Sequence, residues 1–149
     1  MVSPELLRRY PFFAGLDMDQ IVSLAKVADE VEVEAGHYFF HEGEELDTFY
    51  LILEGMVAIV VELPDRESII STLGPGETFA WSTVVPPYTA TAGAKALTPC
   101  RVVAFERRAL WKEFETDWRF GYLMMQRVAQ VVRDRLHDTR IQSLAYVTA

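Results

Sequence analysis

The residues best suited to binding chemistry lie in the segment 74–91, near the middle of the chain. This segment opens with a Gly-Pro-Gly turn, continues with small hydroxyl and aromatic side chains, and closes at Pro86-Pro87. Loops of this kind, held between strands, often bind ligands because their backbone amides and hydroxyls can converge on one group. We therefore predict a small-molecule pocket lined by Phe79, Ala80, Trp81, Ser82, Thr83, Tyr88, Thr89 and Thr91.

Catalysis and metal binding are not expected from the remaining polar residues. The sequence has no nucleophile motif for a Ser/His/Asp triad, so no catalytic residue is predicted. A cupin-type metal centre requires clustered histidines with a carboxylate, and histidine is also a usual haem ligand. His37 and His41 have no third ligand nearby in sequence, and His137 lies in the helical C-terminal part. The single cysteine, Cys100, excludes an internal disulfide and is expected to be a buried small side chain.

The composition indicates one compact domain of 149 residues with a substantial apolar core. The net charge of −8 is uneven, because residues 1–100 carry 16 acidic and 5 basic residues, whereas residues 101–149 carry 6 and 9. Such an acidic body argues against direct binding to duplex DNA, since phosphate contacts supply most of that affinity. No apolar run reaches the ~18 residues of a membrane span, and the N-terminus lacks a signal-peptide core. A cytoplasmic protein without membrane contact is expected.

Turn residues and hydrophobic periodicity divide the chain into three parts. Residues 1–29 are expected to form short helices, with Ser3 capping the first and an Asp17/Gln20 capping box opening the second. Residues 30–106 read as short strands separated by Gly and Pro turns, including one strand over Thr89–Leu97. Residues 107–149 are expected to be helical. The predicted fold class is α+β, mainly β: an antiparallel jelly-roll barrel with short N-terminal helices and a long C-terminal helix.

The long C-terminal helix is expected to open at Asp117 and to carry more apolar surface than one small barrel can cover. A terminal helix of this kind favours dimerisation. We predict a homodimer whose seam includes Phe120, Met124, Val128 and Val131.

The order of these motifs resembles the cyclic nucleotide-binding domain of the Crp/Fnr regulators. The resemblance rests on Ala35-Gly36, Glu42-Gly43-Glu44, Asp47 and the run Tyr50–Val57. It continues through Gly74–Phe79, which is similar to the turn into that family's phosphate-binding cassette, through Ala96–Val102, similar to the strand after it, and through Arg135–Ile141, similar to the end of the dimerising helix. The resemblance implies a non-enzymatic regulatory domain with its ligand in the cassette, here residues 74–91.

In family members that bind cAMP, a cassette Glu binds the ribose and an Arg neutralises the cyclic phosphate. The resemblance places Ala80 at the cassette glycine, Trp81 at the glutamate, Ala90 at the arginine and Thr91 at the following hydroxyl. An alternative register places Tyr88 at the arginine and Thr89 after it. Neither register supplies the cation, because no Arg occurs between Arg66 and Arg101 and the one basic residue there is Lys95. A pocket refitted for a less anionic, more aromatic effector is therefore expected.

Three functions remain open at this point. The first is a small-molecule-sensing regulatory module that is not a standard cAMP receptor. The second is a working cAMP or cGMP receptor that uses backbone amides and Lys95, and the third is an interaction domain whose pocket is plugged by Trp81. Crp/Fnr regulators continue into a helix-turn-helix after the long helix, so this chain resembles a single-domain form without direct DNA binding. A homodimer and a protein partner for the signal are expected, and a cyclic nucleotide or other small effector is the expected ligand.

Overall fold

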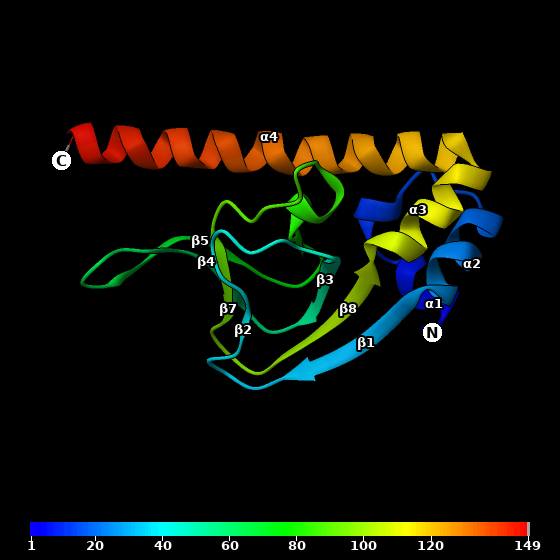
Figure 1. Cartoon of the computed structure of the whole chain (residues 1–149), viewed down its shortest axis with the longest axis horizontal. Coiled ribbons are helices and arrows are strands. Elements are labelled where there is room, and N and C mark those ends of the chain that lie inside the picture. Colours follow the sequence, from blue (N-terminus) through cyan, green and yellow to red (C-terminus); the bar gives the residue numbers. More distant parts are fainter. Residues whose placement is uncertain (149) are drawn as a thin grey trace.

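Two antiparallel sheets form the body of the molecule (Figure 1). The computed structural model describes the backbone of residues 1–148 and the side chains through residue 144. Within this range, the first sheet has the order β1-β8-β3-β6, with β1 (Ala28–Val33), β8 (Cys100–Glu106), β3 (Thr48–Glu54) and β6 (Thr78–Phe79). The second sheet has the order β2-β7-β4-β5, with β2 (Tyr38–Phe40), β7 (Gly93–Ala96), β4 (Val57–Glu62) and β5 (Glu67–Leu73).

Helices cover one end and one side of these sheets. The described helices are α1 (Pro4–Arg8), η1 (Pro11–Phe13), α2 (Met18–Lys26), η2 (Trp81–Val84), α3 (Arg107–Thr116) and α4 (Trp118–Thr148), of which η1 and η2 are 3₁₀ turns. Figure 1 shows α1, α2 and α3 gathered at one end, while α4 runs along the whole molecule and past the β4–β5 hairpin. None of the described helices is long and apolar enough to cross a membrane.

The fold class predicted from the sequence is confirmed, and so are several of its local signals. The capping box of α2 is present in both directions, since Asp17 accepts from Gln20 N at 2.9 Å and Gln20 accepts from Asp17 N at 3.0 Å. Asp117 precedes α4 and accepts a hydrogen bond from Phe120 N at 3.1 Å. These signals are local, so a few neighbouring residues are enough to specify them.

The expected strand Thr89–Leu97 is shorter in the structure. Only Gly93–Ala96 pairs within a sheet, as β7. The preceding residues bond to the loop 43–45 instead: Ala90 N donates to Glu44 O at 2.8 Å, and Gly43 N donates to Ala90 O at 2.9 Å. Because those backbone groups are already satisfied by a loop, they cannot extend the sheet ladder.

The core consists of two clusters of buried hydrophobic side chains. One lies between the helical end and the first sheet and includes Phe13, Leu24, Phe49, Phe105 and Phe120. The other lies between the two sheets and includes Phe40, Ile52, Val57, Phe79 and Val102, together with Cys100. Cys100 is thus buried as expected. The second cluster underlies the segment 74–91 and fixes its position.

The apolar stripe predicted for a dimer seam faces the chain's own core. Phe120, Met124 and Val128 are only 1%, 4% and 4% exposed and belong to the first cluster, and Val131 is half-buried against it. The stripe packs here because α4 continues from α3 and lies on η1 and the first sheet's helical end. A second chain would therefore have to meet the opposite face of α4.

Candidate ligand-binding site

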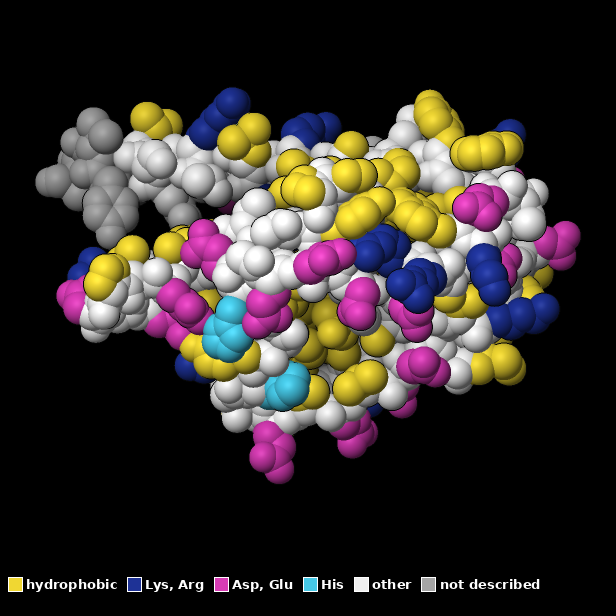
Figure 2. All heavy atoms as spheres, in the orientation of Figure 1, with side chains coloured by type: hydrophobic (Ala, Val, Ile, Leu, Met, Phe, Trp, Pro, Cys, Tyr) yellow, Lys and Arg dark blue, Asp and Glu magenta, His cyan; other side chains and the backbone are white. Residues whose placement is uncertain are grey.

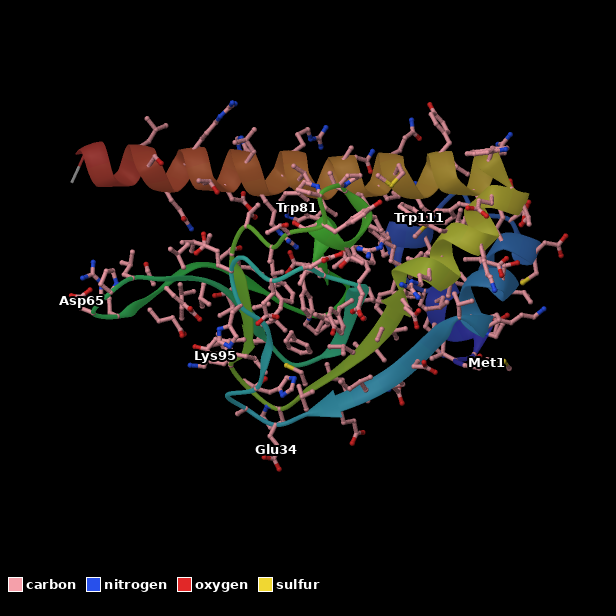
Figure 3. All side chains as sticks on the ribbon, in the orientation of Figure 1. Met1, Glu34, Asp65, Trp81, Lys95 and Trp111 are labelled. Atoms are coloured by element: carbon pink, nitrogen blue, oxygen red, sulfur yellow. The ribbon has the colours of Figure 1, made fainter. Side chains whose placement is uncertain are left out.

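A cavity of about 260 Å³ lies between η2, the second sheet and α4. Ala80, Trp81 and Ser82 border it from the loop, Ser71 borders it from β5, and Arg135 borders it from α4. In Figure 3 Trp81 lies directly beneath α4. The cavity is slightly smaller than the usual range of about 300–1,000 Å³ for small-molecule sites, so it suits a compact ligand.

Four of the eight predicted pocket residues border this cavity: Ala80, Trp81, Ser82 and Thr91. Phe79 is instead fully buried between the sheets, where its ring stacks on Tyr50 with centroids 4.9 Å apart. Thr83 is also fully buried, and its hydroxyl donates to Thr48 O at 2.7 Å. The structure thus places Phe79 and Thr83 beneath the loop as its supports.

Arg107, at the start of α3, holds the outer part of the loop. Its guanidinium carbon lies 3.8 Å from the centroid of the Tyr88 ring, and it donates to Leu46 O at 2.5 Å and to Thr83 O at 3.3 Å. Tyr88 is therefore occupied by a cation–π contact. Its neighbour Thr89 forms an isolated bridge with Glu45. Arg107 was not among the residues singled out from the sequence, because it follows the loop by more than a strand.

The cavity wall offers several polar groups that have no hydrogen-bond partner within the described part of the chain. These are the hydroxyls of Ser71, Ser82 and Thr91 and the indole N–H of Trp81. Polar groups that line a pocket without protein partners are available to water or to a ligand. The arrangement can recognise a small polar molecule, and Trp81 adds a flat aromatic surface beside it.

Arg135 is the cationic side chain that the sequence reasoning missed. It lies more than fifty residues from Trp81 along the chain but borders the same cavity, and its Nη2 donates to Thr78 O. Burial lowers the pKa of Arg135 from its ordinary value, and the nearby carboxylates of Glu77 and Asp138 only partly oppose this. One sequence signal existed: Arg135 follows Val128 and Val131 on the inner face of α4.

Lys95, the other candidate cation, faces away from the cavity. Lys95 lies on β7, and its Nζ is 3.4 Å from Glu67 Oε1 on β5 and 5.2 Å from the centroid of the Tyr38 ring on β2. In Figure 3 Lys95 lies well away from Trp81. Lys95 is therefore engaged with its own sheet and does not border the site. Figure 2 shows that acidic side chains are spread over the visible face of the two sheets.

Ala80 occupies a backbone conformation that favours glycine, with φ = 69°. An L-residue in this left-handed region costs about 1 kcal/mol, whereas glycine adopts it freely but loses more chain entropy on folding. We expect Ala80→Gly to raise the free energy of unfolding by roughly 0.5 kcal/mol and Ala80→Val to lower it, since β-branched residues tolerate positive φ poorly. Urea unfolding followed by circular dichroism measures both. A stabilising effect of valine would contradict this interpretation of the turn.

Comparison with known proteins agrees with this geometry. The family model of the cyclic nucleotide-binding domain matches residues 30–117. The chain belongs to the cyclic nucleotide-binding domain family. That match includes the segment 74–91 and every strand except the first two residues of β1, and it ends at the residue that precedes α4.

Individual relatives of this cyclic nucleotide-binding domain are regulators and single domains. A CRP-like cAMP-activated global transcriptional regulator of Mycobacterium tuberculosis is 35% identical over 107 residues, covering 71% of this chain and 48% of that protein. The chain therefore spans about half the length of that regulator. A solved putative cyclic nucleotide-binding protein of Geobacter metallireducens is 34% identical, with a TM-score of 0.83, covering 92% of this chain and all of that one. The N-terminal domain of a Streptomyces coelicolor transcriptional regulator is 31% identical, with a TM-score of 0.72, covering 87% and 91%.

Proposed function

We propose that this cyclic nucleotide-binding domain is a non-enzymatic regulatory module that senses a small effector in the cavity between η2 and α4. The observation that carries the proposal is the cavity itself, because it joins a loop rich in unpartnered polar groups to a long helix. An effector that contacts both elements would favour one position of α4 over others and so pass a signal along the helix. Family members are generally ligand-binding regulators, which agrees with a role without catalysis.

The effector is not expected to be cAMP bound in the manner of standard receptors. The resemblance puts Trp81 and Ala90 where such receptors carry a glutamate and an arginine, and both residues border this cavity. A phosphate in the standard position would receive no cation from the loop, and burying it there without one costs several kcal/mol. The Mycobacterium tuberculosis relative is named as cAMP-activated, and that activity would require other anchors here.

The alternative of a plugged domain is less well supported. A plug would bury the Trp81 indole and leave no space beside it. Trp81 is instead half-buried, and about 260 Å³ remains next to it. This space favours an effector site over a filled one.

Cavity occupancy can be tested with a variant that fills the space. Ala92 borders the cavity from the segment before β7, and Ala92→Phe should close it without touching the core. We expect calorimetry to give dissociation constants above about 10 µM for cAMP and cGMP. A thermal-shift screen of metabolites should find compounds that stabilise the wild-type chain but not Ala92→Phe. Tight cAMP binding would contradict the missing-anchor interpretation, and equal stabilisation of both chains would place the site elsewhere.

We further propose that the module dimerises through the outer face of α4. Apolar residues recur there at alternating intervals of four and three, a coiled-coil spacing, and the stripe is Trp118, Tyr122, Met125, Ala129, Val132 and Leu136. Trp118, Tyr122 and Leu136 are 79%, 63% and 49% exposed, so this face is uncovered in the single chain. Val132 and Leu136 also border the cavity, so a partner helix would lie beside the effector.

A charge at the centre of this stripe should separate the chains. We expect Ala129→Glu to give the mass of one chain by light scattering at about 10 µM, while the wild type gives the mass of two, because a carboxylate buried in the seam costs several kcal/mol. Ala129 is exposed in the single chain, so its own fold should remain intact. The control is His137→Glu, which is exposed on the same helix outside the stripe. A wild-type chain that is already monomeric would refute the proposal.

A further inference from the structure

We propose that the cavity takes a small aromatic anion, with its charge held by Arg135 and its ring placed against Trp81. This inference rests on the proposed function and names the chemical class of the effector. It departs from the family pattern, in which the cation comes from the loop, because here the cation comes from α4. The shared chemistry is a planar ring with one carboxylate. Cyclic nucleotides fall outside it, because their ribose would meet Trp81 where standard receptors carry the glutamate.

The Arg135 guanidinium keeps hydrogen-bond donors that the described part of the chain does not use. It is half-buried, and it forms no ion pair with any carboxylate in the described part of the chain. Its described protein partner is the backbone carbonyl of Thr78. A guanidinium carries five N–H donors, so donors remain for a ligand in the cavity.

The two carboxylates that act to raise the pKa of Arg135 do not replace an anionic ligand. Glu77 accepts a hydrogen bond from Gly74 N at 2.7 Å, so its carboxylate is used at the turn before β6. Asp138, one turn further along α4, also borders the cavity, but it is exposed, so water and salt screen its charge. Both favour the charged guanidinium, but the loss of water outweighs them. A buried cation with incomplete compensation is stabilised when an anion binds beside it.

Thr78 is the buried polar residue in contact with Arg135. Thr78, whose carbonyl accepts from Arg135, is only 2% exposed, and its hydroxyl has no hydrogen-bond partner. Thr78 and Arg135 both border an adjoining cavity of about 350 Å³, which shares Ser71, Arg135 and Asp138 with the first. Native proteins rarely leave a buried hydroxyl unpaired, and a polar atom placed beside Thr78 would satisfy this one.

Trp81 supplies an aromatic surface at the same cavity. Trp81 borders the same cavity as Arg135 and belongs to the loop, whereas Arg135 belongs to α4. A ligand that spans them would need an aromatic part at one end and an anionic group at the other. Stacking on the indole and a charge-assisted hydrogen bond to the guanidinium act on different parts of such a ligand and so add specificity.

The test uses two fluorescent probes that differ in one group. 8-Anilinonaphthalene-1-sulfonate is an aromatic monoanion, and N-phenyl-1-naphthylamine has the same rings without the sulfonate. We expect Arg135→Met to lower the affinity for the anionic probe about tenfold, as loss of one charge-assisted hydrogen bond predicts. The affinity for the neutral probe should not change. Arg135→Lys should retain part of the difference because it keeps the charge. Arg133→Met is the matched control, since the Arg133 side chain is 75% exposed two residues away.

The outcomes separate this inference from the proposed function. An anionic probe that binds no tighter than the neutral one, or that is unaffected by Arg135→Met, would overturn the anion site. Equal losses for both probes would also overturn it, since Arg135 would then only support the cavity. Ala92→Phe tests the cavity independently: if it abolishes binding of both probes while Arg135→Met does nothing, the effector site stands and only its anionic character is lost. Circular dichroism spectra of each variant establish that it is folded.

Discussion

Replacing Gly55 with alanine should destabilise the domain by about 3 kcal/mol or more. Gly55 opens the turn between β3 and β4 with φ = 97°, and an added Cβ would lie 2.5 Å from Pro99 O and 2.7 Å from Cys100 Sγ. The left-handed backbone costs about 1–2 kcal/mol for any L-residue, and the clash with the Pro99 backbone and the buried Cys100 adds roughly 1–3 kcal/mol more. Urea unfolding monitored by circular dichroism gives the difference in free energy.

Gly43→Ala separates these two contributions. Gly43 has nearly the same backbone conformation, with φ = 89°, but nothing lies within 4 Å of the added Cβ. We expect this variant to lose only the conformational part, about 1 kcal/mol. Equal losses of unfolding free energy at the two positions would mean that the close contact of Gly55 with Pro99 and Cys100 does not affect stability.

Replacing Phe79 with alanine should cost about 3–5 kcal/mol, the usual range for deleting a buried aromatic ring. Phe79 is fully buried, and its centroid lies 4.9 Å from those of both Phe39 and Tyr50. Since Phe79 directly precedes Ala80, the cavity left behind would also loosen the loop that carries Trp81. The melting temperature and the affinity of the folded fraction for the fluorescent probes should therefore both fall.

The control for Phe79 is Ile69→Ala on β5. Ile69 is 53% exposed, so its truncation should change the free energy of unfolding by less than about 0.5 kcal/mol. This pair tests whether Phe79 supports the loop or contacts a ligand. If Phe79→Ala weakened ligand binding without loss of stability, Phe79 would be a contact residue, as the sequence had suggested, and its role as a support would be wrong.

The fold could be predicted from the sequence because most of its signals are local. The Asp17/Gln20 capping box and the Gly-marked turns each depend on a few adjacent residues, and period-two alternation distinguishes strands from helices. The strand predicted over Thr89–Leu97 failed at its first half because Ala90 pairs with a loop 46 residues earlier. No local pattern can report such a partner.

The candidate site was predicted only in part, for the same reason. Ala80, Trp81, Ser82 and Thr91 could be expected from their positions in one loop, and they border the cavity. Phe79 alternates with its neighbours in β6 and so points between the sheets, and Tyr88 is held by Arg107 from α3. Whether a loop residue faces a ligand or the core depends on the elements that pack against it.

The sequence by itself determined the family, the mainly β fold and the absence of an arginine from the segment 74–91, because motifs and residue types are read along the chain. The tertiary structure alone decided which faces of α4 are free. Phe120, Met124 and Val128 are buried in their own chain, so the exposed stripe is the one that begins at Trp118. It also brought Arg135 to Trp81, since only the path of α4 across the sheets places a cation from the end of the chain in a pocket from its middle.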